Sequence, residues 1–288
     1  MMRFHHWALA TAALSTALLG GDSRAATIRD LGVSPLGFQV AIGAATAEAY
    51  KSVAGMGLDM EAVRDPNTRP PTYRAGKKAW SQVKLVQVVG SLTSNTFDTD
   101  LGRDVTKIAF EPTTIDVILT ANADPKLPPR SIPGPSKIGK VTFTLTSSAS
   151  VADWGRAFVA GTATARDITI NLRSVRGEVQ RTMILKRALL VSYACDGAAA
   201  QIVVQPDALQ TSGAANKVLI DWVQAGLDGS TNGRRDAKVT WNGTTTRGTT
   251  TLKSAFPVEI AWGTLDGTSA AQLVDTVTIQ PDSIDPLP

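Results

Sequence analysis

The second half of the chain contains an internal repeat. Five short matches recur in the same order, each 67 to 75 residues after its first occurrence. Ordered self-similarity of this kind indicates two copies of one supersecondary unit, so both copies are expected to share a fold. The spacing is widest at the last match, which predicts a longer loop in the second copy, around residues 263–273. The matches are Asp153-Trp154 with Asp221-Trp222, Arg166-Asp167 with Arg235-Asp236, 182–188 with 249–255, 189–193 with 256–260, and 203–207 with 278–282.

Each copy reads as one short helix followed by strands. Residues 141–146 alternate apolar and polar side chains, with the period of a half-buried strand. Prolines at 66–71 and 127–135 predict loops, and the second of these segments is also a candidate extended arm or insertion joint. Helices are predicted at 151–160, capped by Ser150, and at 216–227. We therefore expect a mainly β fold with a short flanking helix in each copy. The further predicted strands are 37–43, 83–89, 168–172, 201–205, 238–241 and 276–280.

Six residues of the repeat are candidates for packing or assembly. Trp154 and Trp222 lie on the apolar faces of the predicted helices, where each indole would pack against the sheet. The Arg-Asp pairs open the next predicted strand of each copy. They are interpreted either as surface ion pairs of little energetic weight or as charges at a contact between subunits. These pairs are Arg166 with Asp167 and Arg235 with Asp236.

The first 25 residues are typical of a secretory signal peptide. A short basic start precedes the uncharged residues 7–19, and Ser23-Arg24-Ala25 places small residues where a signal peptidase cleaves. We expect cleavage after Ala25 and export to the periplasm or beyond, with an uncleaved anchor as the alternative. No later stretch is long and apolar enough to span a bilayer. The rest is expected to divide into a module at 26–209, with an insertion at about 65–130, and a repeated half-module at 210–288.

The composition excludes most catalytic chemistry from the exported chain. The only histidines, His5 and His6, lie within the expected signal. Residues 267–271 resemble the nucleophile segment of subtilisin-type proteases, but no histidine remains to accept the Ser269 proton. The single cysteine, Cys195, cannot form an intramolecular disulfide or a multi-thiolate metal site, and its apolar surroundings predict that it is buried. We predict no catalytic residue, cofactor or metal.

Weaker alternatives remain at this point. Asp98 and Asp100 could bind a hard cation such as calcium, although the other oxygen ligands are not visible in the sequence. A carboxylate pair or a Ser-Lys dyad would make the protein a hydrolase, and nothing in the sequence places either. With 29 basic and 25 acidic residues scattered along the chain, no nucleic-acid binding is expected. A second function class is a secreted β-sandwich that binds glycan or an envelope partner. Its candidate stacking residues are Trp80, Trp241 and Trp262.

The middle of the chain resembles the contractile phage tail-tube family. The resemblance rests on the Pro-Gly turn and strand at 132–146, the Asp153-Trp154 helix, the strand opened by Arg166-Asp167, and the glycine turn and strand at 177–193. Residues 37–43 and 50–57 are similar to the opening strands of that family. The similarity covers roughly residues 35–209.

This resemblance implies a β-sandwich or small barrel with a flanking helix, the fold shared with the inner tube of type VI secretion. It also implies that the protein is structural and that copies assemble into six-fold rings stacked as a hollow tube. The chain departs from the family in its export signal and in its repeat. A fused pair of modules predicts a trimeric ring with pseudo-six-fold geometry, and other tail-like or envelope proteins are possible partners.

Overall fold

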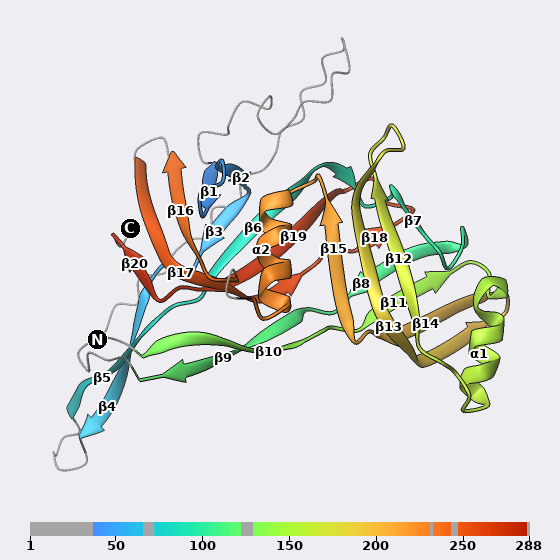
Figure 1. The fold of residues 1–288 in the computed structure, drawn as a ribbon, viewed down its shortest axis with the longest axis horizontal. Coiled ribbons are helices and arrows are strands. Elements are labelled where there is room, and N and C mark those ends of the chain that lie inside the picture. The colour runs from blue at the N-terminus through green and yellow to red at the C-terminus, as the bar shows by residue number, and fades with distance from the viewer. Residues whose placement is uncertain (1–36, 66–71, 122–128, 231–232, 243–246, 287–288) are drawn as a thin grey trace, which may run out of the picture.

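The computed structural model describes residues 37–65, 72–121, 129–230, 233–242 and 247–286. Within these ranges the chain forms twenty strands, two α-helices and one 3₁₀ turn, so the expected mainly β fold is confirmed. The molecule is elongated, and most strands run through two sheets that follow one another along its long axis (Figure 1). The expected signal peptide and the proline segment at 66–71 lie outside the described residues. The described helices include none with the length and apolarity to cross a membrane.

The first sheet has ten described strands, drawn from three separate parts of the chain, within residues 38–93, 113–137 and 235–285. Its main path runs β2-β1-β16-β17-β19-β6-β3, with β20 and β9 also pairing to β17, and β10 to β9. Its strands are β1 (Phe38–Ile42), β2 (Glu48–Tyr50), β3 (Ser52–Ala54), β6 (Val83–Thr93), β9 (Thr113–Thr120), β10 (Arg130–Lys137), β16 (Arg235–Asn242), β17 (Arg247–Ala261), β19 (Gln272–Gln280) and β20 (Ser283–Asp285).

The second sheet has eight described strands, seven of which lie between residues 97 and 213. Its path runs β18-β8-β11-β14-β13-β12-β7, with β15 pairing to β13. Its strands are β7 (Phe97–Thr99), β8 (Val105–Phe110), β11 (Val141–Leu145), β12 (Arg166–Arg173), β13 (Val179–Asp196), β14 (Ala199–Gln205), β15 (Ala208–Gly213) and β18 (Leu265–Asp266).

The two paths have the same order of strands. Read from β7, the second sheet runs β7-β12-β13-β14-β11-β8, and the first runs β1-β16-β17-β19-β6-β3 in the matching positions. Each has a short extra strand, β15 or β20, beside the long strand β13 or β17. The pairing of β7 with β12 also matches that of β1 with β16, because Phe97 lies opposite Leu172 as Phe38 lies opposite Trp241. The common order therefore extends to strands that lie outside the repeat seen in the sequence, namely β1, β6 and β3 in the first sheet and β7, β11 and β8 in the second.

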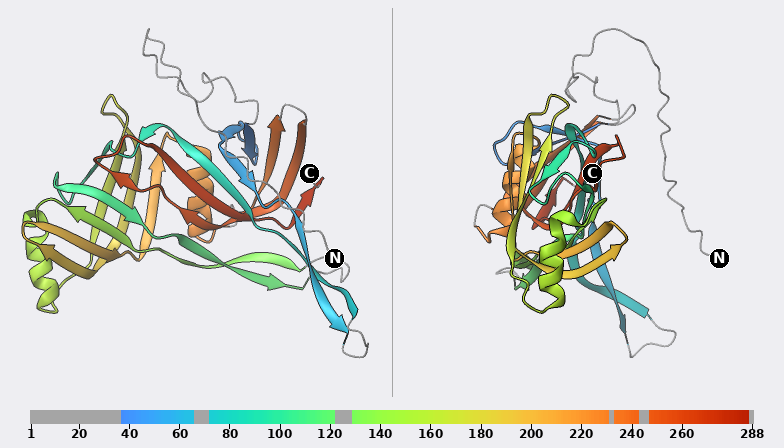
Figure 2. Two further views of the ribbon diagram at one scale, coloured as in Figure 1. Left: turned by 180° about the vertical axis from the view of Figure 1, so that it is seen from behind. Right: turned by 90° about the vertical axis from the view of Figure 1, so that its right-hand side faces the viewer.

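Two hairpin arms leave the sheets at corresponding places. The β4–β5 arm, formed by β4 (Leu58–Asp65) and β5 (Thr72–Trp80), joins β3 to β6, and the β9–β10 arm joins β8 to β11. The β9–β10 arm runs along the body, whereas the β4–β5 arm projects from one end (Figures 1 and 2). The expectation of a loop at 127–135 is wrong for residues 130–135, which belong to β10. The strand accepts Pro133 because a bulge follows it, between Pro133 and Ser136.

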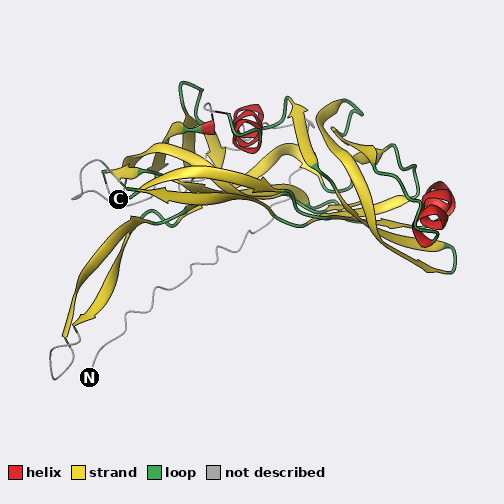
Figure 3. Cartoon of the chain, turned by 60° about the horizontal axis from the view of Figure 1, so that its bottom comes forward, coloured by secondary structure: helices red, strands yellow, loops and turns green. Residues whose placement is uncertain are grey.

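Alternating burial along the strands builds the core. Ile168, Ile170 and Leu172 of β12 are buried while the residues between them reach the surface, as the sequence pattern predicts. Helix α1 (Ala152–Val159) follows the 3₁₀ turn η1 (Ala149–Val151), and α2 is Lys217–Leu227. The two helices lie well apart, one at the end of the second sheet and one over the middle (Figure 3). The predicted Ser150 cap is wrong, because Ser150 lies within the 3₁₀ turn η1. The residue at the N-cap position of α1 is Val151, whose side chain cannot cap the helix.

Candidate functional site

The strongest candidate site is the contact by which the two sheets join within one chain. Strand β9 pairs with the end of β17, where Thr114 lies opposite Glu259 and Thr113 opposite Ile260. Strand β18 pairs with β8, where Leu265 lies opposite Ile108. The segment between β8 and β11 of the second sheet thus supplies β9 to the first sheet, and the segment between β17 and β19 of the first sheet supplies β18 to the second. Backbone hydrogen bonds fix the register of both additions.

A buried ion pair reinforces this contact. Arg181 of β13 donates from Nη1 to Oδ2 of Asp275 on β19 over 2.6 Å, and both side chains are 1% exposed. The other carboxylate oxygen accepts the backbone N–H of Gly263 at 3.2 Å. The guanidinium lies beside the Trp262 ring, 5.4 Å from its centroid, and its Nε and Nη2 find no hydrogen-bond partner within the part of the chain that the structure describes. Since a lone buried charge is costly, each of these two residues depends on the other.

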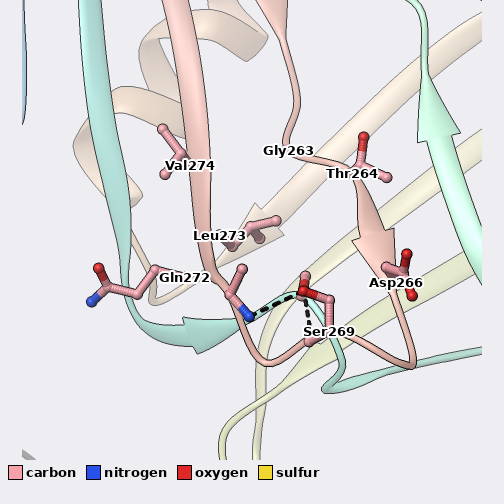
Figure 4. A pocket seen from close by; sticks show the side chains of 9 residues that line it. Gly263, Thr264, Asp266, Ser269, Gln272, Leu273 and Val274 are labelled. Carbon is pink, nitrogen blue, oxygen red and sulfur yellow. Dashed lines mark hydrogen bonds between the residues drawn. The ribbon is translucent and has the colours of Figure 1, made fainter.

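A shallow pocket of about 310 Å³ lies in the long loop between β17 and β19. Gly263, Thr264 and Asp266 line one side and Gln272, Leu273 and Val274 the other (Figure 4). The Ser269 hydroxyl accepts the Ala271 N–H at 3.3 Å, and the Ser269 carbonyl accepts the Ser94 hydroxyl at 2.6 Å. These bonds hold the loop against the end of β6. The protease-like segment at 267–271 is therefore a fixed surface loop that directly follows β18.

Hydrogen bonds from Thr268 hold the pKa of Asp266 below its usual range, first from the hydroxyl and then from the backbone N–H. The carboxylate also lies 3.8 Å from the Lys107 ammonium of β8. Asp266 is therefore an acceptor that orders its own turn and faces the neighbouring strand β8. Among the described residues, no three His, Cys, Asp or Glu side chains gather where they could hold a metal ion.

The two predicted tryptophans occupy matching positions. Trp154 donates its indole N–H to the carbonyl of Thr164 at 3.0 Å, and Trp222 donates to Gly233 at 2.8 Å. Each bond ties a helix to the segment that leads into the next strand. Trp222 is fully buried and Trp154 is 7% exposed, so both serve to pack their helices. Neither lies at the β9–β17 contact.

The two predicted aspartates also make the same bonds. Asp167 accepts the backbone N–H of Arg187 at 2.9 Å and the ammonium of Lys186 at 2.6 Å. Asp236 accepts from Ser254 and Lys253, each at 2.9 Å. These bonds, led by the backbone N–H, hold the pKa of both carboxylates below the usual range.

Each aspartate secures a left-handed residue in a long strand. Arg187 has φ 47° and Ser254 has φ 48°, a backbone region that side-chain-bearing residues adopt at a cost. At this position β13 turns from β12 and β15 towards β14, and β17 turns from β16 and β20 towards β19. The carboxylate therefore fixes the point where the long strand changes partners.

The arginines of the Arg-Asp pairs face elsewhere. Arg166 stacks on the Trp154 ring with its guanidinium carbon 3.9 Å from the ring centroid. Burial lowers the pKa of Arg166, and the Asp100 charge opposes that shift. Arg235 begins β16 opposite Ala255, and its side chain passes beside Gly43, with Cδ 3.8 Å from the position that a β-carbon would take there. The structure thus brings none of the six predicted residues into the β9–β17 contact, and their role in assembly stays a prediction.

Two further contacts recur at matching places. Gln205 donates to the carbonyl of Ile138 at 2.9 Å, and Gln280 donates to that of Trp80 at 3.2 Å. The N–H of Asp207 donates to the Lys186 carbonyl, as that of Asp282 does to Lys253. The glutamines sit at the base of the two hairpin arms, so both arms leave their sheets beside the same kind of anchor.

Three other sequence expectations have clear outcomes. Cys195 is exposed, so its predicted burial is wrong. It lies near the end of β13, in the part of that strand that pairs, among the described strands, with β14 alone. Asp98 binds Arg173 and Asn171, which fill the carboxylate that the calcium alternative requires. Trp262 is buried beside Arg181 and presents no open face for a sugar.

Sequence reasoning missed Arg181 and Asp275. A signal exists, because Arg181 is in phase with the buried Met183 and Leu185 along β13. Asp275 is likewise in phase with the buried Leu273 and Val277 of β19. A charged residue on the apolar side of a strand indicates a buried partner. The sequence does not show that these two residues are each other's partners.

Comparisons with known proteins give structural likeness at low identity. No protein-family model and no curated protein matches the chain. One similar structure is a chain of the sheath–tube complex of an extracellular contractile injection system (PVC) in its extended state. It has 13% identity and a TM-score of 0.19 over 61% of this chain and 88% of that one. A chain of the anti-feeding prophage tube-terminating cap has 13% identity and a TM-score of 0.20, over 71% and 99%. A chain of the anti-feeding prophage baseplate has 9% and 0.20, over 70% and 99%.

Proposed function

We propose that this protein is an exported structural subunit that assembles with copies of itself into rings or tubes and has no catalytic role. The resemblance in its sequence is to the contractile phage tail-tube family, and the proposal assigns the chain to that kind of assembly. The support from the structure is the pair of matching sheets and the way in which they join.

We propose further that the chain contains one module twice, with one copy inserted in the other. Residues 97–213 would form the inner module. Residues 38–93 and 216–285 would together form the outer module, in place of a division at residue 209. The matching strand order and the paired contacts of Trp154 with Trp222 and Asp167 with Asp236 support this division.

The observation that carries the proposal is the unequal use of the two arms. The β9–β10 arm of the inner module pairs with β17 of the outer module in the same chain. The β4–β5 arm, among the described residues, forms a sheet with its own two strands only. Such a contact joins two different surfaces, an arm and a long strand, and is therefore heterologous. Repeated heterologous contacts between copies give closed rings or filaments. Three chains would supply six modules to one ring.

Light scattering after size-exclusion chromatography, together with electron microscopy of the purified chain, tests this function. We expect a mass close to three times that of the chain and rings of uniform width that stack at higher concentration. A monomer that persists at high concentration would refute self-assembly. Amino-terminal sequencing of protein recovered outside the cytoplasm tests export, for which the expected first residue is Ala26.

A further inference from the structure

We infer that the β4–β5 arm of one chain pairs with the free edge of β13 in a second copy, with Leu58 opposite Tyr193. This inference rests on the proposed function and deepens it, because it names the two surfaces that meet. It takes the contact inside the chain as the template for the contact between chains.

The template is the β9–β10 arm on β17. Its first two residues, Thr113 and Thr114, lie antiparallel to Ile260 and Glu259. Helix α2 covers the same place, because the Ser136 hydroxyl of β10 donates to the Leu227 carbonyl at 3.4 Å. Arm, helix and long strand together bury this part of the first sheet.

The β4–β5 arm begins at the corresponding position. Val83 of β6 lies opposite Ile279 as Val141 of β11 lies opposite Val204, so these valines match. Three residues before each valine stands the carbonyl that receives the glutamine, Trp80 or Ile138.

The register of the hairpins completes the match. Leu58 lies opposite Trp80, and Asp59 opposite Ala79. In the other arm Thr114 lies opposite Lys137, which places Thr113 at the level of Ile138. Leu58 therefore corresponds to Thr113, and Asp59 to Thr114.

The strand that corresponds to β17 is β13, and its edge is free. Ser192 pairs with Val203 as Glu259 pairs with Thr278, and Tyr193 pairs with Ile202 as Ile260 pairs with Val277. The end of β17 has β19 on one side and β9 on the other. From Leu189 onward, β13 pairs only with β14 in the part of the chain that the structure describes.

Exposure of apolar side chains marks the same edge. Leu189 and Val191 are 44% and 39% exposed, whereas Phe256 and Val258 at the matching positions are 0% and 5% exposed. A helix contacts the long strand in both sheets, and only β17 also has an arm. The exposed pair is therefore the surface that an arm would cover, and an open strand edge with apolar side chains is a site for strand addition.

The two surfaces lie at opposite ends of the molecule. The β4–β5 arm extends from the end that holds β16, β17 and β20, while the ends of β13 and β14 lie near α1 at the other end (Figures 1 and 3). An arm cannot reach the β13 edge of its own chain across this distance. The partner is a second copy of the chain, joined head to tail.

The contact between chains is expected to be weaker than the contact within a chain. The connection from β13 to β14 is a turn of two residues, while the connection from β17 to β19 is long enough to carry β18. The matching position of Arg181 is Gly248, so the buried ion pair has no counterpart there. The outer junction consists of the arm and the apolar pair, which allows assembled rings to come apart on dilution.

Engineered disulfides in a Cys195→Ser background test the pairing. Chains with Asp59→Cys are mixed with chains with Ser192→Cys and oxidised, and we expect a disulfide-linked dimer of the two chains. Directly opposite residues in an antiparallel pair have Cα atoms about 4.5 to 5.5 Å apart, within the range of a disulfide. Thr114→Cys with Glu259→Cys in one chain is the matched positive control, and it should give an intrachain bond. Val175→Cys, at an exposed site in the turn between β12 and β13 and not on the free edge that begins at Leu189, replaces Ser192→Cys as the negative control.

A second pair of variants measures the apolar edge. Leu189→Asp with Val191→Asp should raise the concentration at which the oligomer dissociates by about 100-fold, and leave the melting temperature of the dilute monomer unchanged. Val175→Asp is the control and should change neither.

The outcomes separate this inference from the proposed function. An oligomer with the Asp59–Ser192 cross-link supports both. An oligomer whose intrachain control forms but whose interchain cross-link does not would overturn the pairing and leave self-assembly intact. A monomer at all concentrations would overturn both, and an oligomer only with a different tail protein would overturn the second copy as the occupant.

Discussion

Replacement of one member of the Arg181–Asp275 pair should strongly destabilise the fold. Both side chains are buried, and the Asp275 carboxylate accepts hydrogen bonds from Arg181 and from the Gly263 N–H. Arg181→Met leaves a buried carboxylate with one amide donor, and Asp275→Asn leaves a buried guanidinium without a counter-ion. Breaking a buried pair in this way costs about 3–5 kcal/mol, and each substitution should lower the free energy of unfolding by that amount.

The double variant should lose less than either single variant. With both charges gone, the remaining cost is that of a neutral side-chain amide at position 275 beside an apolar side chain, on the order of 1–2 kcal/mol. Urea unfolding followed by circular dichroism, at a protein concentration where the chain is monomeric, gives the three free energies. Single-variant losses that add to within about 0.5 kcal/mol in the double variant would refute the reasoning, because additive effects mean that the two side chains do not interact.

Three further predictions concern the matching contacts of the two sheets. Trp222→Phe should cost about 2–4 kcal/mol, measured by urea unfolding, because it leaves a cavity and an unsatisfied carbonyl; Trp154→Phe should cost less because that ring reaches solvent. Asp167→Asn with Asp236→Asn should lower the melting temperature at pH 7. Since their folded pKa values lie below the unfolded ones, that difference should shrink as the pH falls below about 4 and vanish below the folded values, and a difference of the same size at pH 7 and at pH 2 would contradict the charge argument. Gly155→Ala should destabilise by about 1–3 kcal/mol in thermal unfolding, although alanine normally favours a helix, because its methyl group would meet the tyrosine ring of β13.

The sequence predicts the strands better than it predicts how they pair. Strand β11 is predictable from the sequence because residues 141–146 alternate strictly between apolar and polar side chains. Helix α2 is predictable because its apolar stripe forms the buried face of the helix. Strand β10 is not predictable in this way, because Pro133 is typical of a loop and the bulge that accommodates it depends on the partner strand β9. Local patterns report the environment of a residue, whereas pairing depends on residues far away in the chain.

The matching of the first halves of the two sheets was hidden for a related reason. Phe38 matches Phe97 and Val83 matches Val141, but each is an isolated apolar identity whose neighbours along the strand differ. Cores accept many combinations of apolar side chains, so such positions diverge while the fold is kept. The polar contacts that define the repeat, at Trp154 and Asp167, lie in the second halves, where the sequence shows it.

The discontinuous first sheet sets the order in which the protein can complete its structure during synthesis. Residues 97–213 supply seven strands of the second sheet in one stretch, so these strands can pair as soon as that stretch has emerged. Strand β6 must wait for β19, since Val88 pairs with Val274, and until then its edge is open. The β9–β10 arm waits for β17 in the same way. A chain truncated before its last strands therefore has no finished first sheet, and in the proposed assembly it could not add to a growing ring or tube.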